Sequence, residues 1–319
     1  MYTILLIGAG QIGSHYLCGL VKVNKLVKII VVDPNVMSQT ISKKRWIDAE
    51  GEKSGHQIKF MSDLSLLNTT VDLAIIATSS KDRSSVIQNV ALKVNPQYWV
   101  IEKILAQSSD DLDLIQHITS KAKGAWVNTP RRLMIWHQAL KRKFSGQGPF
   151  NVTKSGGLWG LACNAIHFID LVSWWTEESL LSLDNTNLSK TWYESKRAGY
   201  FEINGELRAK FSGETELILR SDPDIHEDVM SVKLRNNCVW VINEEKSAAS
   251  ISGGGEVLNG IVEYQSNITA TMVNKILMNG TCDLPSLEES IKQHRIFIQA
   301  MLDHWRNFSS STDKTVPIT

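Results

Sequence analysis

The sequence predicts an α/β protein in which an N-terminal doubly wound parallel sheet is followed by an α+β domain with a large, mainly antiparallel open sheet. Three observations predict this fold. An apolar run over residues 3–7 leads into spaced glycines, apolar runs alternate with helical patterns as far as residue 128, and strand patterns dominate after residue 175. Alternating strands and helices are typical of a parallel sheet covered on both faces. We therefore expect a first domain over residues 1–128 and a second over 129–319, whose C-terminal helix, 286–308, packs back on the first.

The three glycines directly after the first apolar run form a G-x-G-x-x-G motif. In a dinucleotide-binding βαβ unit, or Rossmann unit, the first glycine lets the chain turn, the second lets a pyrophosphate approach, and the third lets the helix pack on the strand. The N–H groups that open the next helix, expected over residues 14–24, face the phosphates. A tight turn in a protein without a cofactor is the alternative. The predicted cofactor residues of this loop are Gly8, Gly10, Gln11, Ile12 and Gly13.

A second apolar run, residues 29–32, ends at Asp33, twenty residues past Gly13. A carboxylate at this place accepts hydrogen bonds from the adenosine ribose and repels a 2′-phosphate, so it favours NAD over NADP. Three basic residues follow on the next predicted helix, and they either reach the same edge or form a solvated helix face. These are Lys43, Lys44 and Arg45.

Composition excludes several classes of function. The formal net charge is +1, so there is no electrostatic argument for binding to nucleic acid or a membrane surface. The four cysteines, at positions 18, 163, 238 and 282, have no metal-ligand spacing, and we expect reduced thiols and no metal. The N-terminus enters a strand directly and no apolar run could span a bilayer, so we expect a cytoplasmic protein.

Polar residues follow two further buried runs. The run over residues 71–77 ends in Thr78 and Ser79, and the run over 99–101 ends in Glu102 and Lys103. Ligands of open α/β sheets bind beyond the carboxyl ends of the strands, so these residues are candidates for the cofactor cleft. A helix N-cap is the alternative role for Ser79.

A dehydrogenase needs a group that takes the proton of the substrate hydroxyl. Lys103 is one candidate, although the ordinary lysine pKa of ~10.4 has to fall for it to act as a base near neutral pH. His167, on an apolar helix predicted over residues 164–175, is the other, because its ordinary pKa of ~6.5 needs little change. A core histidine with satisfied hydrogen bonds is the alternative for His167.

The whole chain resembles the Gfo/Idh/MocA oxidoreductases. Gly8 to His15 is similar to the family's cofactor loop, residues 77–79 to the end of its fourth strand, residues 102–104 to its Glu-Lys-Pro motif, and residues 156–170 to its Gly-Gly…Asp-x-Gly-x-His-x-x-Asp segment. The resemblance implies a Rossmann domain followed by an α/β domain with a large open sheet. It also implies that Lys103 and His167 are catalytic and substrate-positioning residues, and that Thr78, Ser79 and Glu102 lie near the nicotinamide.

The sequence departs from the family motifs at three positions. Ile104 replaces the proline of the Glu-Lys-Pro motif, so we expect the loop to take another backbone path. Cys163 replaces an aspartate and Ala165 a glycine. Asn164 could hydrogen-bond a sugar hydroxyl in place of the missing carboxylate.

Two segments are similar to family members encoded with genes for bacterial surface polysaccharides and nonulosonic-acid sugars. They supply the predicted substrate residues Asn128, Arg132, Asn164 and Asp170. Arg132 and its neighbour Arg131 suit an anionic sugar acid or nucleotide sugar through bidentate pairing, with a solvated helix start as the alternative.

We therefore expect an NAD-dependent oxidoreductase of a sugar, sugar acid or nucleotide sugar. A cofactor-binding sensor or scaffold with a decayed site is the second hypothesis, and reduction of an imine or linear tetrapyrrole on the same fold is a third. One face of the second-domain sheet is expected to be free, and we predict a homodimer or homotetramer formed through it.

Overall fold

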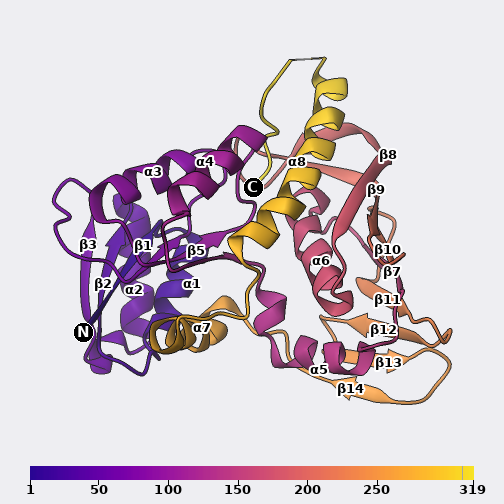
Figure 1. Cartoon of the computed structure of the whole chain (residues 1–319), viewed down its shortest axis with the longest axis horizontal. Coiled ribbons are helices and arrows are strands. Elements are labelled where there is room, and N and C mark those ends of the chain that lie inside the picture. Colours follow the sequence, from indigo (N-terminus) through magenta and orange to yellow (C-terminus); the bar gives the residue numbers. More distant parts are fainter. Residues whose placement is uncertain (311) are drawn as a thin grey trace. The chain divides into compact units, whose positions relative to one another are not determined.

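The computed structural model of the chain describes residues 1–310 and 312–319 (Figure 1). The chain divides into two compact units. The first comprises residues 1–106, 110–130 and 263–288, and the second comprises residues 107–109, 131–262 and 289–319. Residues 263–288 thus return to the first unit after most of the second has been built.

The first unit contains a six-stranded sheet of parallel strands in the order β3-β2-β1-β4-β5-β6. Its strands are β1 (Tyr2–Ile7), β2 (Val27–Val32), β3 (Gln57–Met61), β4 (Leu73–Ile76), β5 (Tyr98–Glu102) and β6 (Gly124–Asn128). The central strands β1 and β4 are almost wholly buried, as expected for strands covered on both faces. The strand order reverses between β1 and β4, and the carboxyl ends of these two strands flank the crevice in which such sheets bind ligands.

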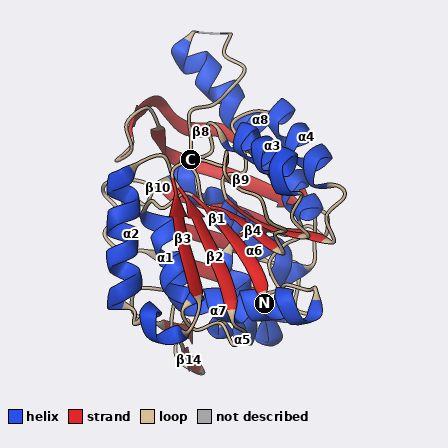
Figure 2. Ribbon diagram, turned by 90° about the vertical axis from the view of Figure 1, so that its left-hand side faces the viewer, coloured by secondary structure: helices blue, strands red, loops and turns tan. Residues whose placement is uncertain are grey.

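Helices cover both faces of this sheet. They are α1 (Gln11–Leu20), α2 (Val36–Asp48), α3 (Arg83–Val94), α4 (Ser109–Thr119) and α7 (Gln265–Asn279), with a short 3-10 helix η1 (Gly51–Ser54). Figures 1 and 2 show α3 and α4 on one face and α1, α2 and α7 on the other. At Gly19 of α1, a Cβ atom would lie 2.5 Å from the Cβ of Thr269, so α7 packs closely on α1.

The second unit is built on an eight-stranded sheet in the order β14-β13-β12-β11-β7-β10-β9-β8. Only the β7–β10 pair is parallel among its described strands, which confirms the predicted mainly antiparallel sheet. The strands are β7 (Asn151–Gly156), β8 (Leu180–Glu194), β9 (Phe201–Phe211), β10 (Glu216–Ser221), β11 (Val229–Lys233), β12 (Val239–Asn243), β13 (Ala248–Ile251) and β14 (Val257–Asn259).

Three helices and a 3-10 turn complete the second unit, namely η2 (Pro130–Leu133), α5 (Ile135–Phe144), α6 (Leu161–Thr176) and α8 (Leu287–Ser309). Alternate residues of β10 are buried, which is the pattern of a strand with one face on a core. The apolar helix α6 packs on β9 and β10. No helix among the described residues is long and apolar enough to cross a membrane.

Two local predictions are wrong. An Asn-Gly pair between alternating residues is a strong signal of a hairpin turn, and the sequence has such a pair at Asn204 and Gly205. Both residues instead lie inside the continuous strand β9. Gly205 has a φ of +109°, and a Cβ there would lie 2.6 Å from the carbonyl oxygen of Asn187 on β8, so the glycine allows close strand contact rather than a turn. The sequence Ser-Asp-Leu-Ser-Leu-Leu over residues 62–67 predicts a short helical connection. The segment instead forms bends and turns, in which the Asp63 carboxylate accepts the N–H of Ser65 at 2.7 Å.

Candidate functional site

The glycine loop lies at the carboxyl end of β1. Gly8 has a φ of +95°, and a Cβ there would lie 2.9 Å from the carbonyl oxygen of Ala77. A Cβ at Gly13 would lie 1.9 Å from the carbonyl oxygen of Gly8, so no larger residue fits where α1 crosses the strand. At Gly10, by contrast, a Cβ would meet no described atom within 4 Å. The loop is thus tight at its two ends and open at its middle glycine.

Asp33 lies beside this loop. One carboxylate oxygen accepts the N–H of Ala9 at 2.6 Å, and the other accepts the N–H of Asn35 at 2.8 Å. These bonds fix the carboxylate at the edge of the glycine loop, and each oxygen keeps lone pairs for further donors.

Arg45 contacts the first turns of α1. Its guanidinium donates to the hydroxyl of Ser14 and, at 3.1 Å, to Oε1 of Gln11. Lys43 and Lys44 are exposed, so only the third of the three basic residues reaches α1. Burial, and then the charge of Arg45, lower the pKa of His15 in the same turn. The sequence leaves two roles open for Arg45, and in the structure it contacts Gln11 and Ser14, beside the glycines of the predicted cofactor loop.

Thr78 and Ser79 follow β4 and are half-buried. Oγ1 of Thr78 is buried and has no hydrogen-bond partner among the described residues. Such an atom is costly unless water or a ligand satisfies it. The main-chain oxygen of Thr78 accepts from Arg83, which also donates to the main-chain oxygen of Ile104 and is 1% exposed. Sequence reasoning missed Arg83, because an arginine at the start of a surface helix has no pattern that signals burial.

Glu102, at the end of β5, belongs to a buried hydrogen-bond network. Its Oε1 accepts from the Tyr16 hydroxyl at 2.7 Å and from Nδ2 of Asn128 at 2.6 Å. The same Nδ2 lies 2.8 Å from Oε1 of Gln265. Burial, and then the Glu102 carboxylate, raise the pKa of Tyr16 well above its ordinary value. The predicted cofactor residue Glu102 and the predicted substrate residue Asn128 are thus tied to one another inside the first unit.

Lys103 follows Glu102 directly and is half-buried at the carboxyl end of β5. The Lys103–Ile104 peptide bond is cis. Lys103 therefore lies at the same edge of the sheet as the glycine loop and Thr78.

Helix α6 carries three of the predicted site residues, Asn164, His167 and Asp170. Cys163, Asn164 and His167 are half-buried near its start. Asn164 Nδ2 donates to the main-chain oxygen of Trp159 at 2.8 Å. Glu202 of β9 accepts the N–H of Ala162 at 2.9 Å, so a carboxylate of the chain itself caps the positive end of α6. Sequence reasoning missed this cap, since Glu202 is remote from α6 in the sequence.

Arg132 and Asp170 form a buried ion pair. Nη2 of Arg132 lies 2.5 Å from Oδ1 of Asp170, and Nε lies 3.0 Å from Oδ2. Nη2 also contacts Glu289 at 2.6 Å. The side chains of Arg132 and Asp170 are 7% and 1% exposed. The guanidinium predicted to pair with a substrate anion is thus paired with two carboxylates of the second unit, and it is not a solvated helix start.

Arg131 is likewise paired within the second unit. It donates from Nε and Nη2 to the two carboxylate oxygens of Glu244, each at 2.7 Å, and its guanidinium lies 4.5 Å from the ring centre of Phe168. Burial acts to raise the pKa of Glu244, but Arg131 and His137 together hold it well below its ordinary value. His137 is fully buried with Nε2 2.9 Å from Glu244, and burial lowers its pKa.

The lowered pKa of His137 predicts loss of stability in mild acid. The unfolded chain takes up a proton below about pH 6.5 where the folded chain does not, so the free energy of unfolding falls as the pH falls below that value. The substitution His137→Gln keeps an N–H donor for Glu244 and removes the titrating group. We expect it to flatten the profile of melting temperature against pH, whereas His226→Gln, at an exposed histidine, leaves the slope unchanged. If the wild type, His137→Gln and His226→Gln all show the same slope of melting temperature against pH, a group other than His137 is responsible for the loss of stability in acid.

Among the described residues, no group of three or more histidine, cysteine, aspartate or glutamate side chains could hold a metal ion.

Comparison with known proteins places this geometry in a recognised fold. No protein-family model and no curated protein matches the chain. Among solved structures, UDP-N-acetylglucosamine 3-dehydrogenase from Acidithiobacillus ferrooxidans is 12% identical with a TM-score of 0.69, and the match covers 97% of this chain and 98% of that one. A Gfo/Idh/MocA family oxidoreductase from Vibrio cholerae is 14% identical with a TM-score of 0.69, over 98% of this chain and all of that one (100%).

A third solved structure was determined with ligands. Myo-inositol dehydrogenase from Lactobacillus casei, in complex with NAD(H) and myo-inositol, is 14% identical with a TM-score of 0.68, over 96% of this chain and 95% of that one. The chain therefore has the fold of the Gfo/Idh/MocA oxidoreductases, and the predicted resemblance is confirmed at the level of the fold.

Proposed function

We propose that this protein is an NAD-dependent oxidoreductase that transfers a hydride between nicotinamide and a hydroxyl or keto carbon of a sugar, sugar acid or nucleotide sugar. The observation that carries the proposal is the arrangement at the carboxyl edge of the six-stranded sheet. Open space above Gly10, the fixed carboxylate of Asp33 and the end of β5 with Lys103 all lie along this edge.

The residues at this edge fit a dinucleotide. The space above Gly10 admits a pyrophosphate, and the N–H groups of Gln11 and Ile12 open α1 toward it. Asp33 has lone pairs for the ribose hydroxyls, which favours NAD over NADP. The buried Oγ1 of Thr78 gains a partner if the cofactor reaches the end of β4. When bound, the nicotinamide supplies the hydride chemistry.

Lys103 and His167 are the proposed proton-transfer pair. In the oxidation direction, one of them takes the proton of the substrate hydroxyl while the other donates a hydrogen bond to the same oxygen. Asn164, on the same turn of α6 as His167, offers its amide to a further hydroxyl. Arg132 and Asp170 are positioning residues in this proposal, because their buried pair fixes the middle of the helix that carries His167.

A cofactor-binding sensor or scaffold is the second candidate. The features that favour it are Ile104 and Cys163 in place of the proline and aspartate of the family motifs. The Cys163 thiol contacts the main-chain oxygen of Thr319, so the position that carries a carboxylate in the motif holds a sulfur engaged within the chain.

The exposed face of the eight-stranded sheet is our proposed surface for self-association. Leu181 of β8 and Val257 of β14 are 61% and 58% exposed on that sheet. Sedimentation at micromolar protein concentration tests this proposal, and a monomer would contradict it.

Calorimetric titration with NAD and NADP, followed by an absorbance screen at the reduced-nicotinamide band, tests the proposed function. The screen includes neutral sugars, sugar acids and nucleotide sugars. We expect NAD to bind more tightly than NADP and at least one sugar to be turned over. Tight NAD binding without turnover on any substrate would favour the sensor, and binding of neither nucleotide would contradict both candidates.

A further inference from the structure

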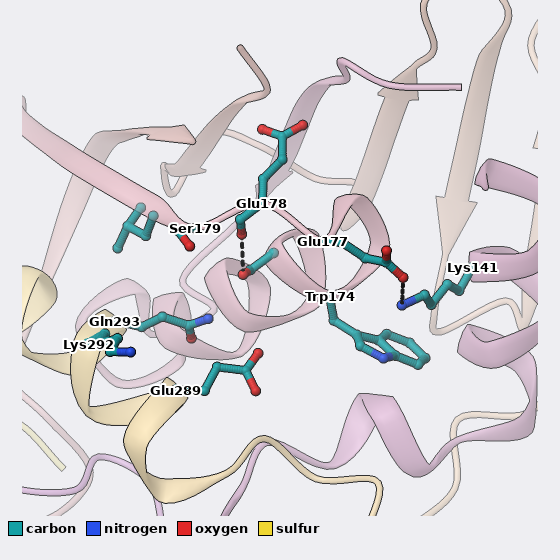
Figure 3. A pocket seen from close by; sticks show the side chains of 10 residues that line it. Lys141, Trp174, Glu177, Glu178, Ser179, Glu289, Lys292 and Gln293 are labelled. Carbon is teal, nitrogen blue, oxygen red and sulfur yellow. Dashed lines mark hydrogen bonds and ion pairs between the residues drawn. The ribbon is translucent and has the colours of Figure 1, made fainter. Parts of the chain in front are cut away.

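A cavity of about 510 Å³ lies at the C-terminal end of α6 in the second unit, away from the half-buried residues at the start of that helix (Figure 3). Its size falls in the range of roughly 300–1,000 Å³ in which proteins bind small ligands. Four elements line it. The lining residues are Lys141 of α5, Ser173 and Trp174 of α6, Glu177, Glu178 and Ser179 of the segment that leads into β8, Leu180 of β8, and Glu289, Lys292 and Gln293 of α8.

Gln293 leaves a polar atom of the cavity wall unsatisfied. The residue is 4% exposed, and its Oε1 is buried without a hydrogen-bond partner among the described residues. A buried amide oxygen without a partner costs free energy unless a donor reaches it. The wall therefore favours an occupant that carries O–H or N–H groups.

Trp174 supplies a flat apolar surface to the same cavity. Its ring is half-buried, and the ammonium of Lys141 lies 5.0 Å from the ring centre. Lys141 also contacts Glu177 at 3.0 Å. Figure 3 shows Trp174 and Lys141 on the opposite side of the view from Gln293 and Lys292. A tryptophan with one accessible face combines apolar contact with a defined orientation of a ring-shaped ligand.

The three carboxylates of the wall already have partners in the chain. Glu177 pairs with Lys141, and Glu289 pairs with Arg132. Glu178 accepts hydrogen bonds from the N–H of Gly213 at 2.8 Å and from the hydroxyl of Thr215 at 2.7 Å. A cationic ligand would thus find each carboxylate already engaged, whereas the oxygens of paired carboxylates still accept hydrogen bonds from hydroxyl groups.

We propose that this cavity is a second small-molecule site, which takes a neutral polyhydroxylated ring such as a pyranose or a cyclitol. The ring lies against Trp174, and a hydroxyl donates to Oε1 of Gln293. The proposal does not rest on the proposed oxidoreductase activity, because none of the residues assigned to the cofactor or to proton transfer lines the cavity.

Fluorine NMR of the full chain labelled with fluorotryptophan tests the proposal. The substitution Trp174→Phe assigns the Trp174 signal, and the probes are methyl β-D-glucopyranoside and myo-inositol. We expect a saturable shift of the Trp174 signal with either probe. The Trp159 signal reports on the start of α6, where Asn164 bonds to the Trp159 main chain, so it separates this site from the proposed active site.

The substitution Gln293→Leu is expected to weaken the binding about tenfold, the loss of one hydrogen bond, without loss of the fold, because no described bond of Oε1 is broken. Gln299→Leu, at an exposed glutamine of the same helix, is the matched control and leaves the affinity unchanged. In unlabelled protein, Trp174→Leu is expected to abolish the heat of binding of both probes to this cavity, measured by calorimetric titration. A Trp174 signal that moves with neither probe, or that moves only with gluconate or glucosamine, would overturn the proposal.

Discussion

Replacing Lys103 with methionine is expected to lower kcat by a factor of about 10²–10⁴, the usual contribution of a positioned proton-transfer group. The affinity for NAD should stay unchanged, because the glycine loop, Asp33 and Thr78 remain in place. Methionine keeps the length of the aliphatic side chain and removes the ammonium group. The measurement is steady-state kinetics on the substrate found in the screen, together with calorimetric NAD binding.

His167→Asn is the companion variant, and its effect should be of similar size. A pH profile of kcat separates a proton-transfer role from a structural one, since removal of the base removes one limb of the profile. Lys121→Met, at an exposed lysine of the first unit, is the matched control. If both site variants keep the wild-type kcat, the assignment of this pair is wrong.

Asp170→Asn is expected to destabilise the protein by about 3–5 kcal/mol, because it leaves the buried guanidinium of Arg132 short of a carboxylate. Glu289 still contacts Arg132, but its side chain is 42% exposed, so it compensates the buried charge of Arg132 less well than the buried carboxylate of Asp170 does. Urea unfolding measures the difference in the free energy of unfolding.

Two variants show whether the charge or the packing is responsible. Asp303→Asn removes an exposed carboxylate 3.8 Å from Arg306 and should change the stability by no more than about 1 kcal/mol. The double variant Arg132→Met/Asp170→Leu replaces both charges with apolar groups and should recover most of the stability lost in Asp170→Asn. A double variant as unstable as the single one would show that packing, not an unpaired charge, sets the cost.

The parts of the fold that the sequence predicts well are those with local signals. The glycine loop, the acid at the end of β2 and the buried apolar runs each depend on residues close in the sequence, and the parallel sheet follows from their alternation. Asn204 and Gly205 show the limit of such signals. The same pair that makes a tight turn in an isolated hairpin lies in a long strand here, where the neighbouring strand β8 comes within 2.6 Å of the position of a Cβ at Gly205.

The site residues that sequence reasoning missed depend on contacts between remote segments. Arg83, at the start of α3, donates a hydrogen bond to the main-chain oxygen of Ile104 in the loop after β5. Glu202 of β9 accepts an N–H at the start of α6. Arginine is a residue type usually found on the surface, so the sequence alone does not show that Arg132 is buried. Its burial follows from its ion pairs with Asp170 and Glu289 in the folded chain. The unsatisfied amide oxygen of Gln293 leaves no trace in the sequence, because its burial depends on packing against other segments of the second unit.

The return of residues 263–288 to the first unit has a consequence for synthesis on the ribosome. Helix α7 packs against α1, Gln265 completes the network around Glu102, and Ser286 pairs with Trp126 at the edge of the sheet. Residues 1–130 are synthesised before this segment, so the first unit lacks the layer that α7 adds until residue 288 has left the exit tunnel. A nascent chain that ends near residue 130 therefore leaves uncovered the part of α1 that α7 covers in the complete unit, and the first unit completes its folding only after most of the second has been synthesised.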